Sequence, residues 1–362
     1  MDFFPSRTLA IYMAKMFFIR TLAVLALLVL VLQALDLLGE SGKILAYAGN
    51  GEAELWTYVS LRAPQLVARF LPFSVLLGTI ITLATLNQNS EVISMKAGGL
   101  SAHQILAPLI VASMGVALLS FVFNETIVAP ATARLSQWEK VEFGPIPAES
   151  NIRTNVWVKD GNNLINARTV TGRGEKVVLQ DITVYNRTEN GLKSLLKGDE
   201  ARFTPSGWRL TNVTQFNVST GTEEKTAEMM VGDTIRPDQF TLTNVSADSL
   251  SIFELHTAIG ELERAGRPTM SLKAGWWHKI SGPMSAILMP LLGAVAAFGL
   301  ARSGQLFIRA VIGMALGFAY FVADNFALAM GNIGAYPTLL AAWAPFMLFF
   351  LIGETVLIRT EE

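Results

Sequence analysis

Six apolar segments, each longer than 20 residues, alternate with more polar stretches along the chain. They cover residues 17–38, 64–86, 104–128, 276–300, 306–330 and 336–358. Two of them contain uncharged runs of 22 and 28 residues, at 280–301 and 97–124. A helix needs about 20 mostly apolar residues to cross a bilayer, because the hydrocarbon offers no water to backbone N–H and C=O groups. The pattern therefore predicts six transmembrane helices.

A different pattern fills the region between the third and fourth predicted helices. Runs at 155–159, 176–185 and 208–218 show partial alternation of apolar and polar residues, as half-buried strands do. Three turn pairs of hairpin type separate these runs: Asp160-Gly161, Asn190-Gly191 and Ser206-Gly207. Short strands at close spacing predict a β-rich, jelly-roll-like domain rather than alternating strands and helices.

One helix is expected at the end of this region. Ser251 and Glu254 have the spacing of a capping box. The apolar residues that follow them at helical spacing are Leu255, Ile259 and Leu262. We therefore divide the chain into three parts: helices at 1–135, a β-rich domain with its final helix at 136–270, and helices at 271–362.

The distribution of charge supports this division. Charged residues make up 16% of the chain and hydrophobic residues 51%, with a mean hydropathy of +0.42. Of the 57 charged residues, 35 lie between residues 129 and 275. The net charge of −1 argues against a nucleic-acid partner, since neutralising phosphates needs a surplus of Lys and Arg. The absence of cysteine excludes disulfides and thiolate chemistry.

The orientation follows from Lys and Arg in the short loops, which favour the cytoplasm. With the N-terminus inside, the cytoplasmic side receives seven such residues: Arg7, Lys15, Arg20, Lys96, Arg302, Arg309 and Arg359. The outer flanks receive three, which are Lys43, Arg62 and Arg69. This bias predicts cytoplasmic termini and a β-rich domain outside the cytoplasmic membrane.

Motifs for independent catalysis are missing from the sequence. It has no phosphate-binding glycine loop, no H-E-x-x-H zinc motif and no G-x-S-x-G nucleophile. The three histidines, His103, His256 and His278, lie far apart in the sequence and in different predicted compartments. We therefore expect a protein that is not an enzyme and that binds no metal or cofactor itself.

The predicted cytoplasmic loop at 87–99 is the most informative short stretch. Ser90 and Glu91 suit the start of a helix, and Gly98-Gly99 suits its end about two turns later. So short a helix is marginal alone in water, so it is expected to dock on something. Its apolar residues Val92, Ile93 and Met95 favour a groove on a cytoplasmic partner. The alternative is a solvated helix at the membrane surface.

Ionisable residues inside predicted spans are candidates for function. Asp324 lies well within the fifth span, and its alternative role is a structural hydrogen bond to a neighbouring helix. We place Asp36 and Glu125 near outer helix ends and Arg20 and Lys279 near inner ends. Long or terminal side chains there reach the interface by snorkelling, which needs no functional explanation.

Four motifs in this order resemble one family. They are N-S-E-V-I-S-M-K-A-G-G at 89–99, W-V-K-D-G-N-N-L-I at 157–165, W-H-K-I at 277–280 with Pro283, and F-A-Y-F-V-A-D at 318–324. Together with three helices, a β-rich domain and three helices, they resemble the LptF/LptG permeases of the lipopolysaccharide-export ABC transporter. The stretch at 157–165 is similar to the W-x-K-D-G-x-x-F motif of the G-type subunit. The F-type paralogue remains the alternative.

The resemblance implies a Gram-negative inner-membrane protein that works in an assembly. In this family an F-type and a G-type permease pair over a cytoplasmic LptB ATPase dimer, which binds ATP and Mg. Lipopolysaccharide enters from the outer leaflet of the inner membrane. ATP-driven closure then pushes it to the periplasmic jelly rolls and to a protein bridge that begins with LptC.

The resemblance also assigns expected roles to residues. The coupling helix near 89–98 implies contact with the ATPase through Ser90, Glu91, Val92 and Met95. The first and fifth helices form lateral gates in this family. The matching gate or cavity residues here are Leu32, Asp36, Phe318, Phe321 and Asp324.

One part of the family pattern is missing. The family has basic residues near the outer end of the first helix, where they meet lipid A phosphates, but this chain has Gln33, Gly39 and Glu40 there. We expect the positive charge to come instead from other residues, which are Lys43, Arg62, Arg69 and Arg134.

Two other classes of function stay open. A protein driven by an ABC ATPase can pull on a periplasmic partner without moving lipid, although such proteins usually have four helices. An integral membrane enzyme acting on lipids is the other alternative, and the missing acid–base motifs disfavour it.

Overall fold

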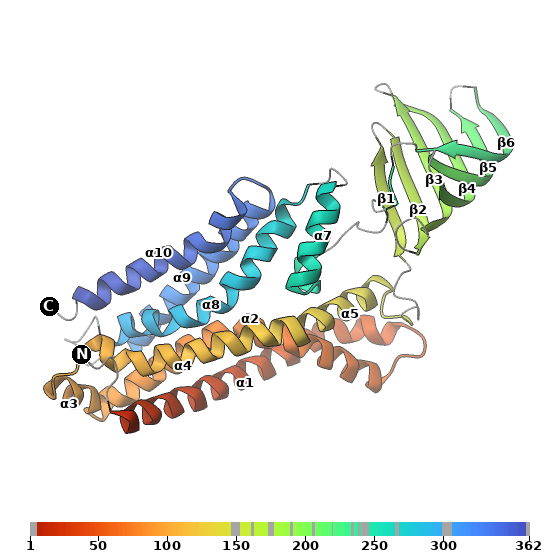
Figure 1. Ribbon diagram of the computed structural model, residues 1–362. Helices are drawn as coiled ribbons and strands as arrows, with labels where there is room; N and C mark the ends of the chain where they lie inside the picture. The colour runs from red at the N-terminus through yellow and green to blue at the C-terminus, as the bar shows by residue number, and fades with distance from the viewer. Residues whose placement is uncertain are drawn as a thin grey trace. The chain divides into compact units, whose positions relative to one another are not determined.

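The computed structural model describes residues 6–145, 153–160, 163–172, 177–188, 191–204, 207–218, 220–232, 235–237, 240, 246–264, 268–298 and 306–359. The chain forms two compact units (Figure 1). The membrane unit comprises Met1–Gly144, Ser246–His256 and Met270–Glu362. The β unit comprises Pro145–Val245 and Thr257–Thr269.

The N-terminal half of the membrane unit begins with two long antiparallel helices, α1 (Arg7–Ala46) and α2 (Glu52–Gln88). The short helix α3 (Glu91–Ala97) follows. Helices α4 (Ala102–Phe123) and α5 (Ala129–Lys140) are joined by a π-helical turn, η1 (Asn124–Val128), into one continuous rod. Within α1 and α2 a close approach occurs at Gly78, where a Cβ atom would lie 2.2 Å from the Thr21 hydroxyl oxygen.

The C-terminal half contains the 3₁₀ turn η3 (Ala247–Ser249) and the helices α8 (Met270–Phe298), α9 (Leu306–Asn332) and α10 (Thr338–Arg359). Helix α7 (Ile252–Arg264) starts in this half, and its residues from Thr257 belong to the β unit. Helix α8 is central, since it contacts α2, α4, α9 and α10. Apolar residues of α2, α4 and α8 form the core between them, including Leu76, Leu106, Leu109, Leu291 and Leu292.

Five helical stretches are long and apolar enough to cross a membrane: Arg7–Ala46, Glu52–Gln88, Ala102–Lys140, Val311–Asn332 and Thr338–Arg359. The remaining predicted span, 276–300, falls largely on α8. The 40 residues of α1 extend for about 60 Å, whereas a bilayer core is about 30 Å thick. Hydropathy located the apolar middle of such helices, but it does not mark how far the helix continues into water.

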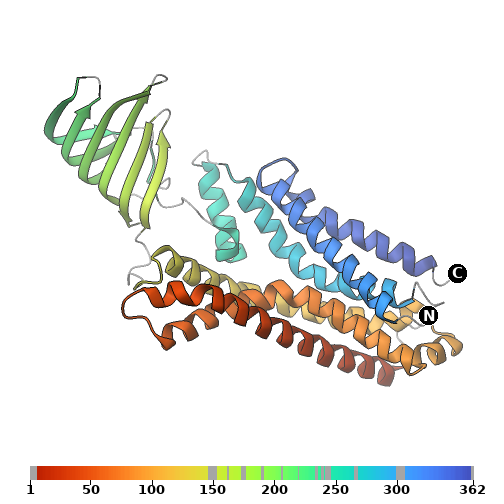
Figure 2. The same ribbon diagram turned by 180° about the vertical axis from the view of Figure 1, so that it is seen from behind.

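The β unit contains six strands: β1 (Arg153–Asp160), β2 (Asn163–Thr171), β3 (Val178–Thr188), β4 (Gly191–Thr204), β5 (Gly207–Asn217) and β6 (Thr222–Val231). They pair antiparallel in sequence order and form one bent sheet (Figure 2). The predicted β-rich domain is therefore confirmed.

The hairpin turns lie one residue from the predicted pairs. Asp160 pairs with Asn163, Thr188 with Gly191 and Thr204 with Gly207, so each connection consists of two residues, 161–162, 189–190 and 205–206. Gly161, Asn190 and Ser206 of the predicted turns lie outside the described residues. Gly191 and Gly207 have φ of 136° and 120° and begin the following strands.

One face of the sheet forms the core of the β unit. Trp208 on β5 is buried, and its indole nitrogen donates to the Ile235 carbonyl oxygen at 3.0 Å. Phe240 packs edge-on against the same ring. On β3 the buried residues Leu179 and Ile182 are three apart, because Asp181 adopts a φ of 53° and interrupts the alternation. The pairing of β3 with β2 and β4 keeps its register across Asp181, so this left-handed residue, and not an inserted one, explains why the alternation in the sequence is only partial.

Candidate functional site

Helix α3 has a defined end and a less regular start. The Gly99 N–H donates to the Lys96 carbonyl and the Leu100 N–H to the Met95 carbonyl, with Gly99 at a φ of 86°. This pair of bonds is a Schellman motif, which needs a left-handed residue and favours glycine. At the start, Ser90 has a φ of 59° and its side chain makes no capping bond. The helix ends as the sequence predicts, but Ser90 does not cap it.

The apolar residues of α3 are expected from the sequence to face a groove on a partner together, but they lie on different faces of the helix. Val92 and Met95 are buried against the helix bundle of this chain, whereas Ile93 is 62% exposed. Glu91 accepts from the hydroxyl of Tyr12 on α1 at 3.4 Å and from the Asn89 amide at 3.3 Å. The surface that α3 offers to another protein therefore centres on Ile93 and the exposed Ser90. The role of Ser90, Glu91, Val92 and Met95 in coupling stays a prediction.

A cavity of about 500 Å³ opens among the helices of the membrane unit. Its walls come mainly from α2, α8 and α9, and single residues of α4, α5 and η3, among them Asp248, and two of η1 complete them. Four of the predicted site residues line this cavity: Arg62, Arg69, Phe321 and Asp324. Apolar side chains such as Leu66, Phe73 and Met289 line it between them.

The predicted residues Arg62 and Asp36 form an ion pair with each other. The guanidinium of Arg62 donates to both oxygens of the Asp36 carboxylate, at 3.1 and 3.0 Å. The hydroxyl of Tyr58 donates to the same carboxylate at 2.6 Å, and Arg62 also donates to Gln65. This bidentate geometry fixes Arg62 and offsets its charge within the chain. The pairing, and not snorkelling, accounts for Asp36.

Arg69 lies about two helical turns further along α2 and is exposed in the cavity wall. It has no ion-pair partner among the described residues. Two other predicted basic residues do not line the cavity: Lys43 pairs with Glu40 of its own helix at 2.8 Å, and Arg134 is exposed on α5. Arg69 is thus the candidate that combines a place in the cavity with an uncompensated positive charge.

Asp324 on α9 faces His278 on α8. Its carboxylate lies 3.8 Å from the His278 Nε2 atom, which is beyond a normal hydrogen bond. Phe321, one turn before Asp324, packs edge-on against Phe73 of α2. Histidine and carboxylate therefore do meet in space, despite their distance in the sequence. A second such contact, between His103 and Glu354, joins α4 to α10 at 3.2 Å.

Two predicted gate residues lie away from this cavity. Phe318 on α9 is 59% exposed, and Leu32 on α1 is half-buried. Neither lines the cavity. Phe318 and Phe321 share one helix but face different surroundings, so they offer a matched pair for experiments.

The predicted position of Lys279 near an inner helix end is wrong. The ammonium of Lys279 lies 3.0 Å from the Glu125 carboxylate and its side chain is 12% exposed, so it is held in a part-buried pair and does not snorkel to the inner surface. Helix α8 follows the β unit in the chain, so its first residues lie on the same side as Glu125. The order of the elements in the chain therefore predicts that Lys279 and Glu125 lie at the same end of the helix bundle. It does not predict that the two side chains form an ion pair.

Metal binding finds no support in the described part of the chain, where no cluster of three or more His, Asp or Glu side chains is arranged for an ion. Among the described residues, the site combines a cavity of mixed polar and apolar lining, paired charges and the uncompensated cation of Arg69. Such a lining suits a ligand that is largely apolar and carries negative charge.

Comparison with known proteins identifies the family. The profile described as lipopolysaccharide export system permease LptF/LptG matches residues 11–359. The chain is 28% identical over 309 residues to the lipopolysaccharide export system permease protein LptG of Escherichia coli (strain K12), covering 83% of this chain and 84% of that protein. It is 24% identical over 324 residues to the LptG protein of Haemophilus influenzae, covering 87% and 89%. Because the profile spans nearly the whole chain, this protein belongs to the LptF/LptG family of lipopolysaccharide export permeases.

Proposed function

We propose that this LptG-like permease extracts lipopolysaccharide from the inner membrane by binding it in the cavity between α2, α8 and α9. The observation that carries the proposal is the charge of the lining. Arg62 is offset by Asp36, Lys279 by Glu125, and His278 faces Asp324. Arg69 alone, of the basic side chains described in the cavity wall, has no such partner.

The chemistry of the lining fits the class of ligand. Acyl chains of a glycolipid contact Leu66, Phe73 and Phe321, while a phosphate contacts Arg69. A guanidinium binds phosphate well because its donors match two oxygens at once. The attraction between the guanidinium and the phosphate is stronger in this partly apolar cavity than in water. The Lys residues that the family has on the first helix are thereby replaced by a cation on the second.

Energy for transport comes, in this proposal, from a separate cytoplasmic ATPase of the LptB type that binds ATP and Mg²⁺. Helix α3 is the contact with that subunit. Its exposed Ile93 enters an apolar groove and Glu91 provides a charged rim. Val92 and Met95 transmit the contact inward, because they pack on the core of the bundle.

The remaining partners complete the path. An F-type permease forms the second half of the cavity, and the β unit lies in the periplasm and passes the lipid to LptC and the bridge. The amino and carboxyl termini lie in the cytoplasm. The chain binds no nucleotide and hydrolyses nothing itself.

Photo-crosslinking tests lipid binding with a control on the same helix. A benzoylphenylalanine at Phe321, in the cavity wall, is expected to capture lipopolysaccharide in vesicles that contain the complete complex. The same substitution at Phe318, outside the wall, serves as the matched control. Arg69→Gln is expected to reduce capture at 321 by about tenfold, as loss of a charge-assisted phosphate contact does.

Two results would contradict the proposal. Equal capture at 318 and 321 places the lipid elsewhere. No capture at 321 in a complex that still hydrolyses ATP and moves its periplasmic partner indicates mechanical transmission without lipid passage.

Co-purification tests the coupling. Ile93→Asp is expected to release the ATPase from the purified complex, while Ser94→Asp, an exposed neighbour, provides a control for added charge on α3. Full retention of the ATPase by Ile93→Asp and by Glu91→Ala rules out α3 as the docking element.

A further inference from the structure

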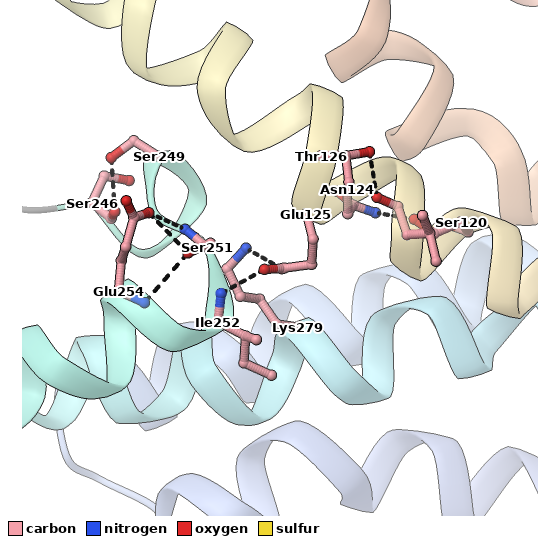
Figure 3. Close-up of polar contacts among 11 residues, drawn as sticks. Ser120, Asn124, Glu125, Thr126, Ser246, Ser249, Ser251, Ile252, Glu254 and Lys279 are labelled. Carbon is pink, nitrogen blue, oxygen red and sulfur yellow. Dashed lines mark hydrogen bonds and ion pairs between the residues drawn. The ribbon is translucent and has the colours of Figure 1, made fainter.

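Three segments of the membrane unit meet at the side chain of Glu125 (Figure 3). One carboxylate oxygen is 3.0 Å from the ammonium of Lys279 on α8. The other accepts a hydrogen bond at 2.5 Å from the backbone N–H of Ile252, the first residue of α7. Glu125 and Lys279 are only 15% and 12% exposed. One buried carboxylate therefore joins η1, α8 and the start of α7.

Glu125 lies in the π-helical turn η1. In η1 the Ala129 N–H bonds to the Asn124 carbonyl, five residues back, and not to the fourth residue back as in an α-helix. Two side chains supply donors to nearby carbonyls: Asn124 bonds to the Ser120 oxygen at 3.2 Å and Thr126 to the Val122 oxygen at 2.8 Å. A π-turn inside an α-helix is uncommon and is frequently found at functional sites.

The contact to α7 is additional to the capping that α7 provides for itself. Glu254 accepts from the Ser251 N–H at 2.9 Å, and the Ser251 hydroxyl accepts from the Glu254 N–H at 3.3 Å. The Ile252 N–H is another of the N-terminal donors that have no partner within a helix. Glu125 satisfies it and also places negative charge at the positive end of the helix dipole.

The hydrogen bond between Ile252 and Glu125 matters because of where α7 lies in the chain. Its first residues, through His256, belong to the membrane unit, and the residues from Thr257 belong to the β unit. Immediately after α7 the chain enters α8. A fixed first turn therefore anchors the start of α7 within the membrane unit.

We propose that Glu125 is a positioning residue for transport: its bond to the Ile252 N–H ties α7 to η1, so that movement of the α4–α5 rod is followed by α7. The inference rests on the proposed transport function. Lys279 has a supporting role, because it offsets the charge of a buried carboxylate that would otherwise be costly. The acceptor oxygen, and not the ion pair, carries the link to α7.

Two double variants separate the acceptor from the ion pair. Glu125→Gln with Lys279→Met keeps an oxygen that can accept from Ile252 and removes both charges. Glu125→Lys with Lys279→Glu restores opposite charges and leaves no acceptor at position 125. If the swapped protein fails to assemble, Glu125→Leu with Lys279→Leu provides a second acceptor-free variant without charge.

The position of α7 is measured directly by electron spin resonance. The sequence has no cysteine, so spin labels at Ile127→Cys and Phe253→Cys, both exposed positions, report one distance in the complete complex. A narrow distance distribution is expected for the parent and for the Gln/Met variant. The acceptor-free variants are expected to show a broadened distribution.

Transport is measured in vesicles as lipopolysaccharide released per ATP hydrolysed. The acceptor-free variants are expected to lose about fivefold or more in this ratio, the size of a typical coupling effect, whereas the Gln/Met variant stays near the parent. A swapped variant with parental distance and ratio overturns the proposal. So does failure of the Gln/Met variant, which would assign the effect to the ion pair. If the distances behave as expected but the parent releases no lipid, the transport function is wrong and the positioning role stands.

Discussion

At the scale of single residues, the ion pairs of the membrane unit determine how much the substitution of a charged residue destabilises the protein. Asp36 and Arg62 are each about a quarter exposed and bonded twice to each other. Removing one partner leaves the other uncompensated in a largely apolar environment, which is more harmful than removing both. The pair therefore behaves as a unit.

Asp36→Ala is expected to destabilise the protein by on the order of 2 kcal/mol, measured as a lower Tm in detergent. Asp36→Ala combined with Arg62→Met is expected to recover most of that loss. The exposed pair Glu40–Lys43 is the control, since surface pairs contribute about 0–1 kcal/mol. A double variant less stable than the single variant would show that the two side chains act independently.

Gln33 on α1 presents the opposite case. It is 8% exposed, and neither its amide nitrogen nor its amide oxygen has a hydrogen-bond partner. A buried polar group without a partner costs about 1–3 kcal/mol, so Gln33→Met is expected to raise the Tm. A lower Tm for Gln33→Met would mean that the amide is bonded in the assembled protein.

Single residues were the least predictable part of the site. Asp36 and Arg62 were both recognised as candidates, but only the crossing of α1 and α2 brings them together, 26 positions apart in the chain. The same holds for Lys279 and Glu125, which are 154 positions apart. Residue type indicates that a charge in a membrane needs a partner, whereas helix packing decides which partner it finds.

At the scale of elements, two adjacent glycines give α3 a built-in control. Gly99 has a φ of 86°, and a Cβ atom there would meet no neighbour, so the cost of Gly99→Ala is conformational. Gly98 has a φ of −77°, which alanine adopts readily. Gly99→Ala is expected to cost about 1 kcal/mol and to lower the amount of co-purifying ATPase. Gly98→Ala is expected to change neither property, and equal effects of the two substitutions would contradict this account.

The start of α7 predicts a dependence on pH. Hydrogen bonds from the Ser251 N–H and hydroxyl lower the pKa of Glu254 below its usual value of 4.5. The carboxylate therefore stabilises the first turn at neutral pH, and this contribution is lost as the pH falls below about 4.5 through the lowered pKa.

Hydrogen exchange of the α7 amides is expected to accelerate over that acidic range. Ser251→Ala is expected to accelerate it already at neutral pH, because the N-cap contributes about 1 kcal/mol, and to flatten its response to acid. An unchanged pH profile in Ser251→Ala would show that the acid effect arises elsewhere.

Elements with a strong local pattern were predicted well. The capping box of α7, the end of α3 and the strands β1, β3 and β5, which match the three predicted runs, follow from short-range rules of spacing and turn chemistry. Where the prediction of an element was inexact, the cause is a local backbone conformation that the hydrophobic pattern does not show. Ser90 takes a left-handed conformation in place of a capping one, and Asp181 takes a left-handed conformation that shifts the alternation on β3.

At the scale of the whole molecule, the uneven distribution of charge along the sequence reflects the architecture. Most charges lie in the region that contains the sheet and α7, and the long apolar helices lie on either side of it in the sequence. The few charges within the helices are consequently prominent: Asp36 pairs with Arg62 and Glu125 with Lys279, whereas Arg69 faces the cavity without a partner among the described residues. Composition alone indicates a membrane part and a more polar part of the chain. The ion pairs in the structure then distinguish the charges with a structural role from Arg69, the candidate for ligand binding.

The orientation of this architecture in the membrane is open to a direct test, again because the chain has no cysteine. An impermeant maleimide applied to spheroplasts is expected to label Ala48→Cys, between α1 and α2, and Thr222→Cys on β6. It is expected to label Ala97→Cys and Arg359→Cys only after lysis. All four positions are exposed, so a difference in labelling reports the side of the membrane and not burial. The bias of Lys and Arg toward one set of loops favours this orientation. Labelling of position 97 before lysis would invert it, and α3 would then have no access to a cytoplasmic ATPase.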